Sequence, residues 1–373
     1  HQGSRKLSSA GTADYGYVAG GSNPELSSTT RIDYSNDTAT SVEKGSMTRT
    51  RRNFGGMSSP AYAYYTAGAM PYPQPALTST DRLDYASDTT TASPKGPLSA
   101  GMSYFSAASP QDIGGSLGST NFIPRIRWVD NATEITAGTP YGYSAGGSAP
   151  ARPVDTVVQR IDFSNDTANA VGKGSLPSVS PAPAPGAGKD MCGALGNTNF
   201  AYFAGGNTWL GTTSEVSRLD YANDSTDCVS KGPLSVAAKS VGATGNTNFG
   251  YVVGGFPGGS FSNVQRIDYS NDTVAASLKG PLTQSTSTSA GAGTLDFGYF
   301  SGGNSPGNPG AKTFIQRIEY SNDTANTSPK GNLATQTERH GNTGNKNFGY
   351  HSGGYNGSSY TSIVQRTTYS NDT

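Results

Sequence analysis

The sequence predicts an all-β protein built from about seven repeated units of four short strands. Three observations support this. A segment Arg-Ile/Leu-Asp-Tyr/Phe recurs along the chain, a Gly-Gly pair precedes most of its copies, and no stretch shows a sustained helical periodicity. Gly, Pro, Asn and Asp also interrupt the chain roughly every 8–12 residues, as is typical of short strands joined by tight turns.

The Arg motif sets the period of the repeat. Its third residue lies at positions 33, 84, 162, 220, 268, 319 and 368, so the intervals are 51, 78, 58, 48, 51 and 49 residues. Four strands in about 50 residues match one blade of a β-propeller. We therefore expect residues 1–373 to form one domain, a closed propeller of about seven four-stranded blades.

Each repeat contains four segments with strand character. The first is an aromatic run ending in Gly-Gly, such as residues 249–255, and the second carries the Arg motif. The third lies between an Asn-Asp-Thr turn and a Lys-Gly pair, such as Lys279-Gly280. The fourth is rich in Ser, Thr, Ala and Gly, such as residues 283–293, and leads into the next repeat.

Ring closure is expected because an open row of blades would expose unpaired edge strands. Lys6-Leu7-Ser8 resembles the end of a Lys-Gly-Pro-Leu-Ser segment, and the last repeat stops after its second strand. The N-terminal segment is therefore predicted to supply the outer strand or strands of the last blade, so that the two ends exchange a strand.

Two segments break the period. Residues 99–138 contain about 28 residues more than the matching interval of another repeat. Within them, Arg125-Ile126-Arg127-Trp128 resembles the Arg motif, so eight blades are an alternative. Because the excess is only about half a blade, we favour seven blades with an insertion. Residues 177–188 are rich in Pro and Ala and are predicted to form an exposed loop.

The Arg motif places Arg and Asp on one face of a strand and the two apolar residues on the other, since alternate residues share a face. Both faces of a blade pack on neighbouring blades, so we predict a structural ring of Arg–acid pairs between blades. The alternative is a charged groove for a ligand. The residues predicted to form these pairs are Arg31, Asp33, Arg82, Asp84, Arg160, Asp162, Arg218, Asp220, Arg266, Asp268, Arg317 and Glu319.

The Ser-Asn-Asp-Thr segment after most Arg motifs has good turn chemistry, because Asn and Asp side chains bond their own backbone. It also matches the Asn-x-Thr/Ser acceptor of N-glycosylation. Both interpretations stay open on the sequence. The candidate glycosylation residues are Asn36, Asn131, Asn165, Asn223, Asn271, Asn322, Asn356 and Asn371, with Asn326 a further match close before Pro329.

The two cysteines, Cys192 and Cys228, lie in strand-like segments of neighbouring repeats. One disulfide between them and two separate thiols are both compatible with this spacing. Two cysteines in 373 residues exclude a small disulfide-stabilised scaffold.

The net charge and the length of the apolar runs argue against two classes of partner. Lys+Arg and Asp+Glu are both 26, so the net charge is zero, and no basic excess exists to bind nucleic acid. No apolar run approaches the roughly 20 residues that span a bilayer. We expect neither nucleic-acid binding nor membrane insertion.

The sequence carries little catalytic chemistry. His340 and His351 are expected to be ordinary surface or strand residues, and no His or Cys spacing suggests a metal site. No Gly-x-Ser-x-Gly elbow is present, and no helix follows the Gly-Gly pairs to make a phosphate loop. We expect no enzyme and no cofactor. Calcium on the repeated Asp residues and a paired-carboxylate glycoside hydrolase are the alternatives.

The aromatic strand, the Gly-Gly pair and the following strand with an aromatic residue together resemble kelch repeats over nearly the whole chain. This resemblance implies a β-propeller. The usual kelch Trp is replaced by Thr38, Thr89, Thr167, Ser225, Thr273 and Thr324. Some kelch-like propellers are copper oxidases, but the His and Cys placement here does not match them. More loosely, the Arg-Ile-Asp-Tyr-Ser-Asn-Asp-Thr runs look like repeats of virion and tail-fibre proteins.

These features predict a structural or attachment module, extracellular or on a virion surface, that binds a glycan or protein through its loops. Assembly into a larger appendage is a further expectation. A lectin and a propeller hydrolase or oxidase are the alternatives. The loop residues predicted to make contacts are Tyr72, Trp209, Phe256 and Tyr355, since aromatic side chains suit such contacts.

Overall fold

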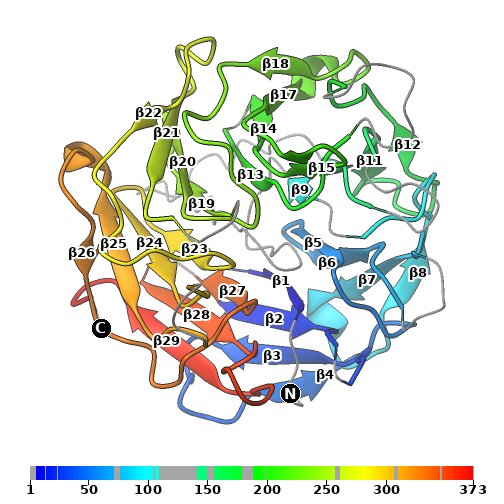
Figure 1. Ribbon diagram of the computed structural model, residues 1–373. Helices are drawn as coiled ribbons and strands as arrows, with labels where there is room; N and C mark the ends of the chain where they lie inside the picture. Colours follow the sequence, from blue (N-terminus) through cyan, green and yellow to red (C-terminus); the bar gives the residue numbers. More distant parts are fainter. Residues whose placement is uncertain are drawn as a thin grey trace, which may run out of the picture.

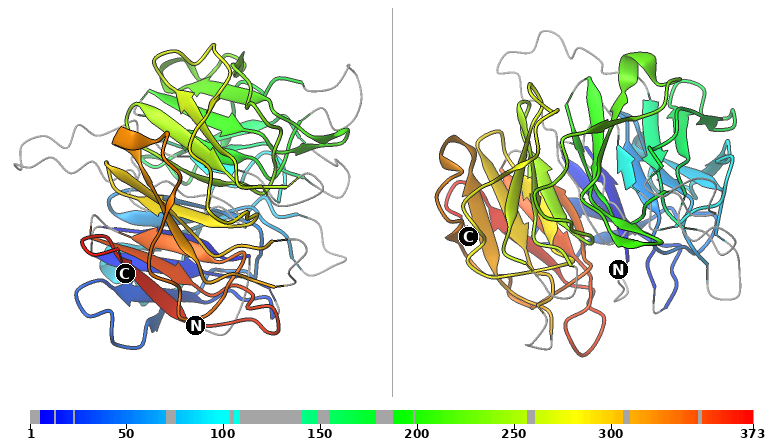
Figure 2. Two further views of the ribbon diagram at one scale, coloured as in Figure 1. Left: turned by 60° about the vertical axis from the view of Figure 1, so that its left-hand side comes forward. Right: turned by 45° about the horizontal axis from the view of Figure 1, so that its top comes forward.

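The computed structural model is a ring of seven antiparallel sheets, which confirms the all-β propeller with seven blades (Figure 1). Blades 1 to 6 each have four strands, and the described part of blade 7 has three. Figure 2 shows the same ring from two other directions. The structure describes residues 6–12, 14–22, 24–70, 76–103, 106–108, 141–148, 155–178, 188–197, 199–256, 261–305, 310–344 and 347–372.

The strands of each blade follow one another from the centre of the ring outward. Blade 1 contains β1 (Ser8–Gly11), β2 (Tyr15–Ala19), β3 (Thr29–Asp33) and β4 (Val42–Lys44). Blade 2 contains β5 (Gly55–Ser58), β6 (Tyr62–Thr66), β7 (Thr80–Asp84) and β8 (Ser93–Lys95). Blade 3 contains β9 (Ser106–Ala108), β10 (Tyr141–Ala145), β11 (Val158–Asp162) and β12 (Val171–Gly172). Blade 4 contains β13 (Gly193–Gly196), β14 (Phe200–Ala204), β17 (Val216–Asp220) and β18 (Val229–Lys231), with a small hairpin of β15 (Asn207–Thr208) and β16 (Gly211–Thr212).

The remaining blades repeat this order. Blade 5 contains β19 (Gly242–Gly245), β20 (Phe249–Val253), β21 (Val264–Asp268) and β22 (Ser277–Leu278). Blade 6 contains β23 (Ala290–Gly293), β24 (Phe297–Ser301), β25 (Ile315–Glu319) and β26 (Ser328–Pro329). Blade 7 contains β27 (Gly341–Gly344), β28 (Phe348–Ser352) and β29 (Val364–Thr368). Three short 3₁₀ turns lie at Tyr85–Ser87, Tyr221–Asn223 and Tyr320–Asn322, and none of the helices described is long enough to cross a membrane.

The strand rich in small residues is the innermost strand of each blade. It was expected to end a repeat, but it pairs with the aromatic strand that follows it, so it opens the next blade. Neighbouring innermost strands pack directly on one another, from β1 through β5 to β27 and back to β1. This close approach needs small residues: a Cβ added to Gly56 would lie 2.4 Å from the carbonyl oxygen of Ser9 in the preceding blade.

The ring closes differently from the predicted strand exchange. The N-terminal strand β1 pairs with β2 as the innermost strand of blade 1, not as an outer strand of blade 7. Blades 7 and 1 instead meet side by side. The Ser9 hydroxyl donates to the Asn342 carbonyl, and the rings of Tyr34 and Tyr350 stack with centroids 4.7 Å apart. The seven sheets are thus joined by packing around the whole ring.

The two irregular segments lie largely outside the described residues. The predicted insertion at 99–138 begins too early, because Ser106–Ala108 forms the innermost strand of blade 3. Residues 109–140, which carry the alternative eighth blade, lie outside the described residues, as do residues 179–187 of the Pro/Ala-rich loop. The described sheets are the seven blades and the two-stranded β15–β16 hairpin.

Candidate functional site

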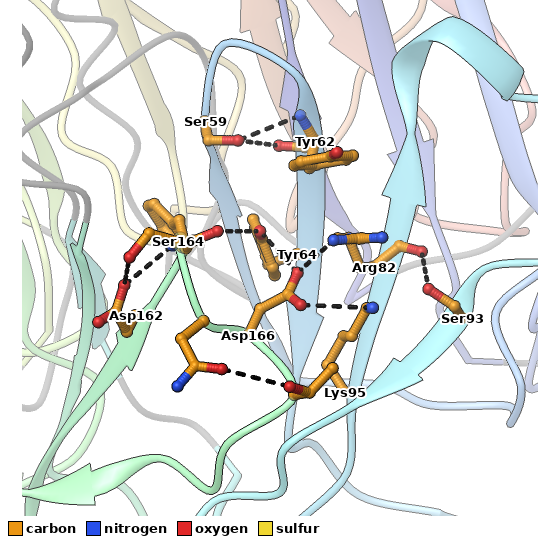
Figure 3. Close-up of polar contacts among 12 residues, drawn as sticks. Ser59, Tyr62, Tyr64, Arg82, Ser93, Lys95, Asp162, Ser164 and Asp166 are labelled. Carbon is orange, nitrogen blue, oxygen red and sulfur yellow. Dashed lines mark hydrogen bonds and ion pairs between the residues drawn. The ribbon is translucent and has the colours of Figure 1, made fainter.

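An aspartate joins each blade to the one before it, and in five of the seven contacts it is buried. Asp166, in the turn after β11, accepts hydrogen bonds from Arg82 Nη1 at 2.7 Å and Tyr64 Oη at 2.9 Å, and its other oxygen lies 3.3 Å from Lys95 Nζ (Figure 3). Tyr64, Arg82 and Lys95 come from three successive strands of blade 2. We call this arrangement the aspartate clamp.

The aspartate clamp is repeated around the ring. Each clamp uses the Asp of an Asn-Asp-Thr-type turn and the Tyr, Arg and Lys of the preceding blade. The clamps are Asp88 with Tyr17, Arg31 and Lys44; Asp224 with Tyr143, Arg160 and Lys173; Asp272 with Tyr202, Arg218 and Lys231; Asp323 with Tyr251, Arg266 and Lys279; and Asp372 with Tyr299, Arg317 and Lys330. Asp37 receives Tyr350 and Arg366 of blade 7.

The clamps correct the predicted Arg–acid pairs. The six arginines do pair between blades, but Arg31 binds Asp88 at 2.8 Å and not an acid of its own motif. Asp33 instead accepts a hydrogen bond from the Ser35 N–H at 2.9 Å and caps the following turn. Asp84, Asp162, Asp220 and Asp268 cap their turns in the same way, and Glu319 accepts from the Ser321 hydroxyl.

The clamp keeps its aspartate ionised. Burial raises the pKa of Asp272, but hydrogen bonds from Tyr202 and Lys231 and the positive charges of Arg218 and Lys231 outweigh it, so the net pKa is lowered. Burial also raises the pKa of Tyr202, which stays a neutral donor. These groups therefore act as a structural ion-pair network and not as a proton-transfer pair.

Aromatic residues complete the contact between blades. Arg82 stacks on the ring of Tyr62 in its own blade, with its guanidinium carbon 4.1 Å from the ring centroid. Tyr64 stacks on Phe163 of the next blade at 4.5 Å. Equivalent stacks recur between every two neighbouring blades. The most repeated residues of the sequence therefore hold the ring together, and a binding site has to be sought in residues that differ between blades.

Residues of that kind gather at one mouth of the ring. All blades have the same strand order, so their innermost strands begin at the same end of the central axis. The residue three positions before the start of most of these strands forms a β-bridge with the residue that follows, or nearly follows, a Gly-Gly pair. We call this the mouth ring. Its described members are Arg52, Ser103, Asp190, Lys239, Ser287 and Glu338, a mixed set of charges.

Blades 4 and 5 combine mouth-ring residues with exposed apolar side chains. Lys239 Nζ donates to Asn207 Oδ1 at 2.7 Å, and Asn207 also bonds the side chain of Asp190. Burial raises the pKa of Asp190 to about 6, although Asn207 and the charge of Lys239 act to lower it. Asn207 begins the β15–β16 hairpin, which lies inside the circle of blades in Figure 1.

The tip of this hairpin presents a large apolar surface. Trp209 is 56% exposed and Leu210 is 62% exposed, and Phe256, which bridges to Lys239, is 38% exposed. These three residues together with Asp190, Asn207 and Lys239 form what we call the candidate loop site. It places apolar and aromatic surface beside a carboxyl, an amide and an ammonium group, a combination that suits polar ligands with apolar faces.

The predicted loop residues are thus partly brought together. Trp209 and Phe256 belong to the candidate loop site, whereas Tyr355 lies on blade 7, where it packs against Tyr360 with ring centroids 5.3 Å apart. Tyr72 lies outside the described residues. Sequence reasoning missed Asp190, Asn207 and Lys239. An alignment of the residue three positions before each innermost strand would have found Asp190 and Lys239, since that position varies from blade to blade.

The two described histidines are buried in one network. Ser301 Oγ lies 2.9 Å from His351 Nδ1 and 3.2 Å from His340 Nε2, and His351 Nε2 lies 2.9 Å from Thr367 Oγ1. Burial lowers the pKa of His340 to about 4 and lowers that of His351 well below its usual value. Both imidazoles are therefore neutral and shielded from solvent, so a substrate does not reach this Ser–His arrangement. Within the described ranges, no group of three or more His, Cys, Asp or Glu side chains could hold a metal ion.

Of the two alternatives that the sequence left open for the cysteines, the structure shows two separate thiols. Cys192 and Cys228 are both buried thiols in the core between blades 3 and 4, and burial raises the pKa of Cys228 to about 12. The predicted glycosylation residues Asn36, Asn165, Asn223, Asn271, Asn322 and Asn371 are exposed, and Asn356 is half-buried. Asn131 lies outside the described residues. The Asp in six of these Asn-Asp-Thr/Ser segments belongs to a clamp, so turn structure alone accounts for the motif, and glycosylation stays a prediction.

Comparison with known proteins supports the fold. The structure of YjhT is similar, with a TM-score of 0.63 and 11% sequence identity over 88% of this chain and 98% of that chain. At this identity the similarity shows the fold alone. No family model and no curated protein matches the sequence. The chain is therefore a seven-bladed β-propeller.

Proposed function

We propose that this propeller is a non-enzymatic attachment module, displayed extracellularly or on a virion surface, that binds a glycan or protein through its loops. The observation that carries the proposal is the candidate loop site. Trp209, Leu210 and Phe256 are exposed there. The pairing of β15 with β16 and the bridge between Lys239 and Phe256 hold the backbone beside them, so little ordering entropy is lost on binding. The resemblance to kelch repeats, and the looser one to virion repeats, fits this role.

The polar groups of the candidate loop site suit sugar hydroxyls or peptide amides. Lys239 donates and Asn207 both donates and accepts, while the buried Asp190, which is 6% exposed, holds the Asn207 side chain. An aromatic face beside such groups can stack on a sugar ring or an apolar side chain. The proposal needs no cofactor, because recognition rests on these side chains.

A glycoside hydrolase is the second candidate, and the raised pKa of Asp190, about 6, favours it. A general acid of a hydrolase needs a carboxyl group that stays protonated near neutral pH. Such an enzyme also requires a second carboxylate near the general acid. In the candidate loop site the neighbouring position is occupied by the ammonium group of Lys239 and not by a carboxylate. We therefore rank binding first.

A glycan array probed with the labelled chain tests the proposal, followed by titration of the best ligand. Trp209→Ala should weaken binding about tenfold or more, as loss of an aromatic contact at the centre of an interface does. Leu278→Ala is the matched control, because Leu278 is 55% exposed but lies on the outer strand of blade 5. Silence on all glycans and on candidate surface proteins would overturn the proposal. Turnover of a glycoside that Asp190→Asn abolishes would establish the hydrolase instead.

A further inference from the structure

The seam between blades 4 and 5 shows the ordinary packing of two neighbouring blades. The last residue of β14, the residue before β19 and single residues of β19, β20 and β21 belong to one apolar cluster. These five residues are each at most 3% exposed: Ala204, Val241, Ala243, Val252 and Ile267. This seam is therefore closed by apolar side chains, none of which is ionisable.

The seam between blades 6 and 7 has polar residues at the same five repeat positions. They are each at most 6% exposed: Ser301, His340, Asn342, His351 and Thr367. At the position of Thr367, all six other blades have Ile or Leu. Buried polar residues in place of apolar ones cost stability, and such a departure from a regular pattern is expected where a protein carries a function.

The hydrogen bonds of this seam suit neutral histidines. His351 Nδ1 lies 2.9 Å from Asn342 Oδ1, and His351 Nε2 lies 2.9 Å from Thr367 Oγ1. Because an amide oxygen only accepts, His351 carries its one proton on Nδ1, and its Nε2 accepts from the Thr367 hydroxyl. Ser301 Oγ lies 2.9 Å from His351 Nδ1 and 3.2 Å from His340 Nε2, and so joins the two imidazoles. The network is therefore formed with both rings uncharged.

A positive charge on either ring has little to stabilise it. Among the described residues, His340 Nδ1 has no hydrogen-bond partner, so an imidazolium at His340 would bury an N–H group without an acceptor. The two ring centroids are 5.7 Å apart, so two imidazolium groups would repel each other. Burial lowers the pKa of both histidines, and the charge of His340 lowers that of His351 further.

The charged groups closest in the chain, Glu338 and Arg339, do not compensate such a charge. Glu338 is 5% exposed, and its Oε1 lies 3.9 Å from Arg339 Nη1. Among the described residues, no acid contributes to the pKa shift of His340 or His351. The groups that bond or approach the two rings from the packed elements are uncharged: Ser301 and Gly302 of blade 6, and Asn342, Gly354 and Thr367 of blade 7.

We propose that the seam between blades 6 and 7 is an acid-sensitive joint. When His340 and His351 each take up a proton from solvent, blade 7 separates from blade 6 there and water reaches the two imidazolium groups, while the apolar seams stay closed. Glu338 leads into blade 7 and bridges to Tyr355, so this movement also displaces one side of the mouth ring. The inference does not rest on the proposed function, because the candidate loop site lies on blades 4 and 5.

The size of the effect follows from the protons taken up. A histidine in an opened, solvated seam has a pKa of about 6.5, whereas burial in the closed seam lowers the pKa of His340 to about 4 and that of His351 well below its usual value. Lowering the pH from about 7 to about 5 should therefore favour the open seam about 20-fold for each histidine and about 400-fold for both. The closed seam is thus fully stable above about pH 6.5 and weakens as the pH falls.

Amide hydrogen exchange of the full chain, followed by mass spectrometry at about pH 7 and about pH 5, tests the inference. After correction for the pH dependence of the intrinsic exchange rate, residues 341–352 of blade 7 should lose protection about 400-fold. Residues 242–253 are the matched segment of blade 5, and the apolar cluster of their seam with blade 4 contains no histidine among the described residues. This segment should keep most of its protection.

A variant that copies the seam between blades 4 and 5 locates the effect. It combines the substitutions Ser301→Ala, His340→Val, Asn342→Ala, His351→Val and Thr367→Ile, and should remove the acid-induced loss of protection. His351→Val alone should leave a loss of about 20-fold. His1→Gln is the matched control, because it removes the one histidine that is not in this set, and it should leave the whole loss in place. If the combined variant does not fold, the comparison of the two segments in the unaltered chain still decides the question.

Three outcomes would overturn the inference. The first is a loss of protection in residues 341–352 of less than about fivefold, since two histidines require far more. The second is an equal loss in residues 242–253, which would mean that the whole ring unfolds. The third is an undiminished loss in the combined variant. Ligand binding is not part of the readout, so failure of the proposed loop function leaves this test unaffected.

Discussion

Substitution of Gly280 by Ala tests whether the Lys-Gly glycines are needed for contact between blades. An added Cβ at Gly280 would lie 1.7 Å from the Ala325 carbonyl oxygen of blade 6, and real Cβ contacts are essentially never closer than 3.0 Å. The two blades would have to separate there by about 3.0 − 1.7 = 1.3 Å. That movement breaks the hydrogen bond from the Gly280 N–H to the Asp323 carbonyl and strains the salt bridge between Lys279 and Asp323.

The expected cost is about 2–4 kcal/mol, from about 1 kcal/mol for the hydrogen bond and about 1–3 kcal/mol for overpacking. Urea unfolding followed by tyrosine and tryptophan fluorescence measures it as a lower midpoint. Gly172→Ala is the control, because no atom lies within 4 Å of a Cβ added to Gly172, and a change below about 0.5 kcal/mol is expected. Equal midpoints for the two variants would refute the reasoning.

Three further predictions follow from buried groups. Arg51→Met should lower the free energy of unfolding in urea by about 3–5 kcal/mol, because the buried Asp81 carboxylate loses the guanidinium group 2.7 Å away. The double variant Arg51→Met/Asp81→Leu should regain much of this stability. Stability should fall as the pH drops from about 6.5 to about 4, because unfolded His340 binds a proton in this range and folded His340 does not. The free energy of unfolding should decrease by about 3 kcal/mol over this range. His340→Phe should remove that part of the pH dependence of the melting temperature. Cys228 should resist a thiol reagent at pH 8 in the folded chain and react in guanidinium, and rapid labelling of the native protein would contradict its burial.

Much of the fold could be predicted from the sequence because the repeat is regular. The intervals between Arg motifs predicted seven blades, and the alternation of Arg266, Ile267, Asp268 and Tyr269 placed the arginine in a contact between blades. The order of strands within a blade was harder. The small-residue strand could end one repeat or begin the next, and only the crowding at the axis, seen at Gly56, decides between them.

The candidate site was less accessible to sequence reasoning. Trp209 and Phe256 were found because exposed aromatic residues in Gly-rich loops are noticeable, but nothing in the sequence connects them to Asp190 or Lys239. Those residues meet because the start of each innermost strand bridges to a loop of the same blade, and Lys239 reaches across to Asn207 of the preceding blade. Contacts of this kind depend on which loops share a mouth of the ring.

The sequence by itself determined the all-β class, the number of blades and the structural role of the repeated arginines, because those properties follow from period and alternation along one strand. Only the tertiary structure decided that Arg31 binds Asp88 and not Asp33. Asp33 shares a face with Arg31, but its carboxylate bonds the next turn, while the turn of the neighbouring blade brings Asp88 within 2.8 Å. These partners are 57 residues apart in the chain and become adjacent only when blade 2 packs on blade 1.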